Sequence, residues 1–395
     1  MIAYNHQTLD QVLMRSEVER AYKKRLITAG ERNAVNAAYP DDFYSPHIFI
    51  RAGLFIVTAV AILAAVGLML LMDIVRSANS VANFCIFLTI ALYAACEFFI
   101  RGTKHHKSGV DTALMWGAGL AFVTFFFAQE IANSESQISA VIMIGAAYLA
   151  LRFADLPMSV IAYAALIATV YFSLDTSAVL SAFAPFIIAI VSLGAYLLFH
   201  RLSRPWRFRH YRNCLLLLQL CALLSLYGSL NYFIVTELAR DDYYNAAAYE
   251  VATGGSQSAY VPPLAWLFWI TTIAIPAIYL LLGLRNKNRV MLGAGMLLVA
   301  AAVYTVRYYH EIMPIETVML LSGICLVVIA LGAIRYLKTP RHGFTKEEDD
   351  ASEQMEKLHL ESLVIAQTMS TTTTPEKPWN FGGGSGVGGG ATGDF

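Results

Sequence analysis

The stretch AGLFIVTAVAILAAVGLMLLM, residues 52–72, decides the class of fold, because it contains no charged residue. The hydrocarbon core of a bilayer is about 30 Å thick, and a helix needs about 20 residues to cross it. Only helices and closed barrels satisfy their backbone polar groups in lipid. A barrel strand would alternate between apolar and polar residues. This continuous apolar run therefore predicts a transmembrane helix.

Similar apolar runs follow along the chain. They lie near residues 82–100, 112–128, 138–154, 158–174, 179–200, 214–236, 264–284, 290–309 and 315–335. The two runs joined by RFADLP (152–157) are the shortest, so a re-entrant pair there would lower the count by two. We predict an all-α, polytopic integral membrane helix bundle of about ten transmembrane helices.

The composition supports a membrane protein. Of the 395 residues, 57% are hydrophobic and 14% are charged, whereas about 25% are charged in soluble domains. The formal net charge is zero, so no bulk basic charge indicates a nucleic-acid partner. All five cysteines lie inside apolar runs, which predicts core residues and not metal ligands or redox pairs.

Lysine and arginine are distributed unevenly about the predicted helices. If the N-terminus is cytoplasmic, all but three of the 28 Lys and Arg residues lie on the cytoplasmic side. The exceptions are Arg76, Arg240 and Arg307. Cytoplasmic loops carry an excess of these residues, so we predict that the N-terminus and the C-terminus are both cytoplasmic.

Polar segments flank the predicted bundle, which covers residues 48–335. The sequence of residues 1–47 predicts a cytoplasmic helical hairpin. Its second helix begins at a capping box formed by Thr28 and Glu31. Residues 336–395 predict a cytoplasmic tail that is of low complexity and disordered from about residue 368.

The stretch VYTVRYYHEIMPIE, residues 303–316, contains the first candidate site, an outer-face polar cluster of Arg307, His310 and Glu311. A buried proton relay is the alternative, but the charge count places the cluster at the outer end of a helix. The HEIMP segment lacks the second histidine of the zinc protease motif H-E-x-x-H, because residue 314 is proline. We predict no metal site here.

The run 214–236 contains a stripe of uncharged polar residues at helical spacing. Its members are Gln219, Ser225, Tyr227, Ser229 and Asn231. Such residues usually bond to neighbouring helices, and the alternative is the wall of an outward-facing cavity. Pro185 and Pro276 lie inside the flanking predicted helices and are candidate kinks.

Charged residues near the predicted inner helix ends have a structural interpretation. Glu97 lies four residues before Arg101, a spacing that predicts an ion pair. Arg152 and Asp155 lie in one short turn, where we expect a local pair. No deeply buried charge is expected within the bundle.

Three segments carry a resemblance to a known family. They are KKRLITAGERNAVNAAYP (23–40), TALMWGAGLAFVTFFFAQE (112–130) and VYTVRYYHEIMPIETVMLLSGICLVVIALG (303–332). They resemble a family of bacterial predicted membrane proteins defined as a domain of unknown function. The resemblance implies a multi-pass protein of the bacterial plasma (inner) membrane. It implies no catalytic or binding residue.

Two classes of function fit these patterns. The first is a small-solute transporter or permease, with the long outer loop 238–263 as a lid. The second is a non-transporting sensor or assembly module that binds cytoplasmic protein partners through residues 1–47 or 336–395. The polar stripe favours transport, which we predict, with the lipid bilayer and a small solute as partners. We predict no enzymatic activity, cofactor or nucleic-acid partner.

Overall fold

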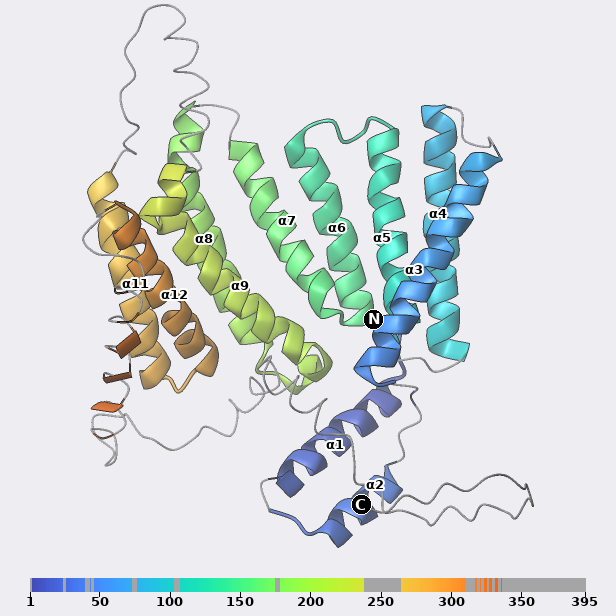
Figure 1. Cartoon of the computed structure of the whole chain (residues 1–395), viewed down its shortest axis with the longest axis horizontal. Coiled ribbons are helices and arrows are strands. Elements are labelled where there is room, and N and C mark those ends of the chain that lie inside the picture. The colour runs from blue at the N-terminus through green and yellow to red at the C-terminus, as the bar shows by residue number, and fades with distance from the viewer. Residues whose placement is uncertain are drawn as a thin grey trace, which may run out of the picture. The chain divides into compact units, whose positions relative to one another are not determined.

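The computed structural model describes residues 2–23, 26–39, 43, 46–72, 77–102, 107–174, 178–237 and 264–309, with single positions between 317 and 335. Within these residues the regular elements are all helices (Figure 1). The predicted all-α class is therefore confirmed. The predicted tenth span, residues 315–335, the outer loop 238–263 and the tail 336–395 lie largely or wholly outside the described residues.

Nine helices in the described part of the chain are long and apolar enough to cross a membrane. They are α3 (Ile48–Leu71), α4 (Ala78–Gly102), α5 (Val110–Ala128), α6 (Glu135–Phe153), α7 (Leu156–Leu174), α8 (Ala178–Leu202), α9 (Arg212–Leu230), α11 (Ala265–Arg285) and α12 (Arg289–Tyr309). A 3₁₀ helix, η1 (Trp206–Tyr211), precedes α9. These helices match nine of the predicted runs and indicate a multi-pass membrane protein.

The N-terminal hairpin forms as predicted. It consists of α1 (His6–Lys23) and α2 (Ala29–Ala38). The Thr28 side chain accepts a hydrogen bond from the backbone of Glu31, and the Glu31 side chain accepts one from the backbone of Thr28. This capping box satisfies two backbone donors that the first turn of α2 leaves free.

Consecutive helices pack in pairs: α4 with α5, α6 with α7, α8 with α9, and α11 with α12 (Figure 1). In the last pair, a Cβ atom on Gly283 would lie 2.9 Å from the backbone nitrogen of Leu292. A Cβ atom on Gly295 would lie 3.1 Å from the backbone nitrogen of Leu280. Small residues allow this close approach of helix backbones, the usual means of helix packing in membranes.

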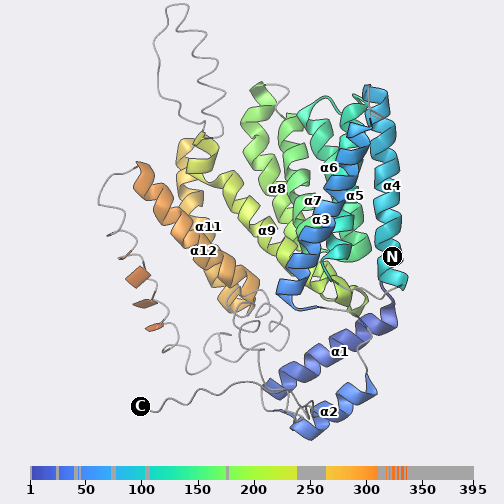
Figure 2. The ribbon, with the colours of Figure 1, turned by 45° about the vertical axis from the view of Figure 1, so that its right-hand side comes forward.

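The bundle contains two apolar cores. The first is built from α4, α5, α6 and the start of α7, together with the N-terminal segment. The second is built from α7, α8, α9, α11 and α12 (Figure 2). Met158 of α7 belongs to the first core and Tyr163 of the same helix to the second. Helix α7 therefore connects the two cores.

Candidate functional site

Helix α9 is interrupted at Asn231, whose backbone is extended (φ −82°, ψ 129°). The chain becomes helical again over residues 232–237. The predicted continuous helix over 214–236 is thus wrong at this point. The Asn231 side-chain amide donates hydrogen bonds to Tyr227 Oη (2.8 Å) and to Thr305 Oγ1 of α12 (3.1 Å). Its carbonyl oxygen accepts one from the backbone of Ile234 (3.2 Å), which caps the new helical turn.

Helix α11 satisfies backbone groups that this interruption leaves free. The Thr271 hydroxyl donates to the carbonyl oxygen of Leu230 (2.7 Å). The backbone nitrogen of Tyr232 donates to Thr272 Oγ1 (3.0 Å). Unsatisfied backbone groups cost several kcal/mol in lipid, so the interruption depends on these threonines.

A second polar layer lies closer to the N-terminal end of α9. Tyr163 Oη of α7 lies 2.6 Å from Ser225 Oγ, and Ser225 Oγ donates to Ser192 Oγ of α8 (2.9 Å). Ser192 is completely buried. One hydroxyl network therefore joins three helices in the second core.

A third polar layer, nearest the N-terminal end of α9, surrounds Gln219, which is almost completely buried. Its Oε1 lies 3.4 Å from His200 Nδ1, and its Nε2 donates to the carbonyl oxygen of Phe199 at 3.5 Å. Arg204 lies 2.9 Å from His200 Nε2. Ser229 donates to the carbonyl oxygen of Leu226 in its own helix (3.0 Å). Three members of the predicted stripe, Gln219, Ser225 and Asn231, thus bond to other helices. This geometry fits the packing interpretation, and the cavity wall stays a prediction.

Both candidate kink residues lie inside helices. Pro185 lies within α8 and Pro276 within α11, and each helix continues past its proline. The interruption in this half of the bundle lies at Asn231 instead. The Asn231 side chain is held there by two other side chains, Tyr227 and Thr305, and by the backbone nitrogen of Ile234.

Arg307 lies in the last turn of α12, next to a layer of aromatic rings. The Tyr232 ring stacks on Trp269 (centroids 4.7 Å apart) and meets Tyr309 edge-on (4.8 Å). The rings of Phe233 and Tyr308 are 4.9 Å apart. Aromatic layers of this kind mark the interface between membrane and water. His310 and Glu311, the other members of the predicted cluster, lie outside the described residues.

We expect Arg307→Ala to fold normally, because Arg307 Nε is buried without a hydrogen-bond partner among the described residues, so the substitution removes no bond from that atom. The expected change in the free energy of unfolding is about 0.5 kcal/mol or less, measured by thermal unfolding in detergent. A proton relay at this position would instead make the variant lose activity while it stays folded.

The predicted ion pair of Glu97 and Arg101 is confirmed, with 2.7 Å between Arg101 Nη2 and Glu97 Oε2. The expected pair of Arg152 and Asp155 is wrong. Arg152 Nε of α6 donates to Glu97 Oε1 of α4 (2.7 Å). Asp155 Oδ2 accepts a hydrogen bond from the backbone of Met158 (3.1 Å), as an N-cap of α7 does. The carboxylate of Asp155 is engaged by its own helix, so Arg152 bonds across to the neighbouring one.

Asp111, in the first turn of α5, is a buried acid that the sequence analysis missed; its exposed fraction is 4%. Oδ1 accepts hydrogen bonds from the backbone nitrogens of Thr112 (2.9 Å) and Gly109 (3.1 Å), and from the Ser108 hydroxyl (3.3 Å). The predicted site residues include no acid at this helix end. The local signal was the Ser-Gly pair before the acid, which supplies these donors.

A cavity of about 10 Å³ lies beside Asp111, which is roughly the volume that one water molecule needs. Its lining includes Tyr4, Cys96, Lys107 and Asp155. Burial raises the pKa of the Asp155 carboxyl above its ordinary value. The cavity thus places two carboxyl groups and one ammonium group at one end of the first core.

Comparisons of the chain with models of known families, with curated proteins and with solved structures find no match. The resemblance to the bacterial family of unknown function stays a prediction. Any function assigned to this chain therefore depends on the geometry of its own side chains.

Proposed function

We propose that this chain is a permease for a small, uncharged polar solute in a bacterial plasma membrane, with both termini in the cytoplasm. One observation carries the proposal: α9 is interrupted at Asn231. The polar layers around Ser225 and Gln219 lie on the same helix. Interrupted membrane helices with polar side chains at the break are typical of the solute sites of transporters.

The chemistry of the layers supports an uncharged solute. The groups at the interruption and in the middle layer are hydroxyls and a carboxamide, from Tyr163, Ser225, Asn231 and Thr305. They both donate and accept hydrogen bonds. A solute with hydroxyl or amide groups exchanges one set of such bonds for another, whereas an ion would require a compensating charge.

The test is solute flux through the purified protein in lipid vesicles. Vesicle swelling in glycerol, erythritol and urea is followed by light scattering, with protein-free vesicles as the reference. We expect the protein to raise the permeability to at least one of these solutes. Permeability equal to that of protein-free vesicles for the whole series contradicts the proposal.

Asn231→Leu is expected to lower this flux about tenfold, because it removes the donors to Tyr227 and Thr305 and the cap of the following helical turn. Ser229→Ala is the matched control, since the Ser229 hydroxyl donates within its own helix. Thermal unfolding of both variants is the check that each of them is folded. Equal flux through the two variants would exclude the interruption as the solute site.

A second candidate is a non-transporting sensor or assembly module. It is favoured by the contacts between the N-terminal segment and the bundle, such as the hydrogen bond from the backbone of Ala3 to that of Arg152 (2.9 Å). Movement of the hairpin α1–α2 on binding a cytoplasmic protein would then alter the bundle directly. This function would be favoured if the protein produced no solute flux in the vesicles and if the hairpin α1–α2 bound a cytoplasmic protein.

A further inference from the structure

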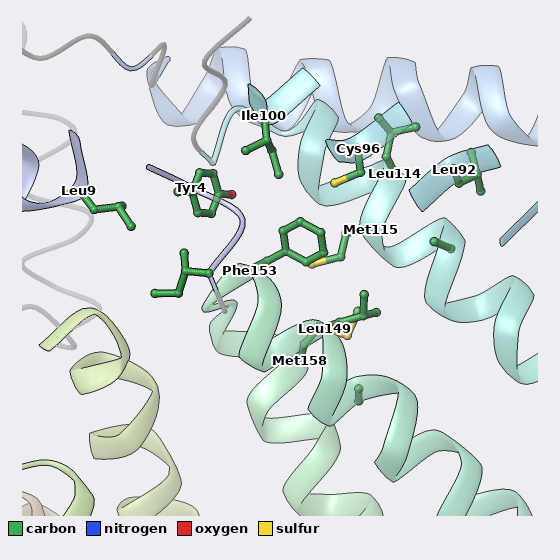
Figure 3. Packing of buried hydrophobic residues seen from close by; sticks show 13 residues of the cluster. Tyr4, Leu9, Leu92, Cys96, Ile100, Leu114, Met115, Leu149, Phe153 and Met158 are labelled. Carbon is green, nitrogen blue, oxygen red and sulfur yellow. The ribbon is translucent and has the colours of Figure 1, made fainter. Parts of the chain in front are cut away.

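The first residues of the chain are inserted into the first core. The exposed fractions of Ile2 and Tyr4 are 9% and 6%, and both belong to the same buried cluster as Ile100 and Phe153. Figure 3 shows Tyr4 together with Ile100 and Phe153. The backbone nitrogen of Ala3 donates to the carbonyl oxygen of Arg152 at the end of α6 (2.9 Å).

Tyr4 lines the cavity beside Asp111. Its hydroxyl donates to Asp111 Oδ2 (3.4 Å), and its side chain forms part of the lining together with Cys96. Burial raises the pKa of the Tyr4 phenol well above its ordinary value, as does the nearby Asp111, so Tyr4 is a neutral donor. Without Tyr4, the acid and the thiol would lose their cover on this side.

A second contact holds the start of α1. Arg209 of η1 donates two hydrogen bonds to Asp10, from Nε (2.7 Å) and Nη2 (2.6 Å). These bonds hold the pKa of Asp10 below its ordinary value. Paired guanidinium donors fix the orientation of a carboxylate as well as its position. The pair therefore sets where α1 leaves the bundle.

Leu9 is the one buried residue of α1, and His210 Nε2 of η1 also lies 3.3 Å from Asp10 Oδ1. The Asp10 carboxylate is partly exposed, and water weakens an ion pair of this kind. Segments with few buried contacts open without unfolding of the remaining structure. The attachment thus holds residues 2–10 against the cavity, and it can open while the remaining structure stays folded.

We propose that residues 2–10 form a detachable latch, held by Tyr4 and by the Asp10–Arg209 pair, whose release opens the inner end of the first core and exposes Asp111 and Cys96. The latch lies in the first core, whereas the solute site proposed above lies in the second, so neither proposal depends on the other. The latch includes the first residues of α1, His6 to Asp10, so a force on the hairpin α1–α2 acts on the cavity.

The test measures access to Cys96, which is 1% exposed and lines the same cavity as Tyr4. The full-length protein in nanodiscs keeps Cys96 as its single cysteine, with Cys85→Ser, Cys214→Ser, Cys221→Ser and Cys325→Ser. Its rate of reaction with a small charged methanethiosulfonate is compared between the native latch, Tyr4→Ala and Asp10→Arg. We expect either substitution to raise the rate at least tenfold. We expect Asp10→Arg combined with Arg209→Asp to return the rate to within about threefold of the native value.

A single-cysteine form that keeps Cys85 is the matched control. Cys85 is also buried on α4, but it lies eleven residues from Cys96, about 16 Å along the helix. A rate at Cys96 that Tyr4→Ala and Asp10→Arg leave unchanged would overturn the latch. A parallel rise at Cys85 would overturn it as well, because the substitutions would then have loosened the whole bundle.

Discussion

Replacing Gly109 with alanine is expected to destabilise the protein by about 3 kcal/mol or more. Gly109 has φ +99°, a conformation that residues with a Cβ atom rarely adopt, and its Cβ would lie 2.2 Å from the carbonyl oxygen of Arg51 in α3. That oxygen belongs to the backbone of a helix, so it cannot turn aside. Strain at positive φ and overpacking each cost about 1–3 kcal/mol.

The measurement is the free energy of unfolding in mixed micelles, together with the yield of folded protein. Gly53→Ala is the matched control, since Gly53 lies in α3 and a Cβ there would have no neighbour within 4 Å. Alanine favours a helix by about 1 kcal/mol over glycine, so the control is expected to be neutral or slightly stabilising. Equal stability of the two variants would contradict the close approach of α3 to Gly109.

Glu97→Ala is expected to cost about 2–3 kcal/mol, the second largest effect. The exposed fraction of the Glu97 side chain is 14%. It accepts hydrogen bonds from Arg152 (2.7 Å) and Tyr93 (3.0 Å) and pairs with Arg101. Its removal leaves the Arg152 guanidinium between helices without this carboxylate. Breaking a fully buried ion pair costs about 3–5 kcal/mol, and partial exposure lowers the figure here.

Arg101→Ala is the control for Glu97, because it removes the more exposed partner of the same carboxylate. The exposed fraction of the Arg101 side chain is 65%, and exposed ion pairs contribute about 0.5 kcal/mol. Thermal unfolding of both variants in detergent makes the comparison. If Glu97→Ala were no more costly than Arg101→Ala, the bond between α4 and α6 would contribute little to the fold.

Local patterns in the sequence predicted much of the fold. The apolar runs predicted the ends of nine helices to within six residues, because lipid requires long uninterrupted apolar segments. The pair of Thr28 and Glu31 predicted the start of α2, and the pair of Glu97 and Arg101 was predicted from its helical spacing. Each of these features depends on residues that are close in the chain.

The functional candidates were harder to predict, because their geometry depends on distant residues. The interruption at Asn231 is stabilised by Thr271 and Thr305, which lie 41 and 74 residues away from their partners. Arg152 bonds to Glu97 across 55 residues. Asparagine and threonine also occur in ordinary membrane helices, and arginine occurs at their ends, so their presence alone indicates neither contact.

The sequence by itself determined the class of this protein, its helical segments and the side chains available for polar contacts. These follow from hydrophobicity and spacing, which are properties of neighbouring residues. Only the tertiary structure decided that Asn231 interrupts α9, that Arg152 pairs with Glu97, and that Tyr4 covers Asp111. Buried polar groups must find partners in their surroundings, and those surroundings exist only after the helices have packed.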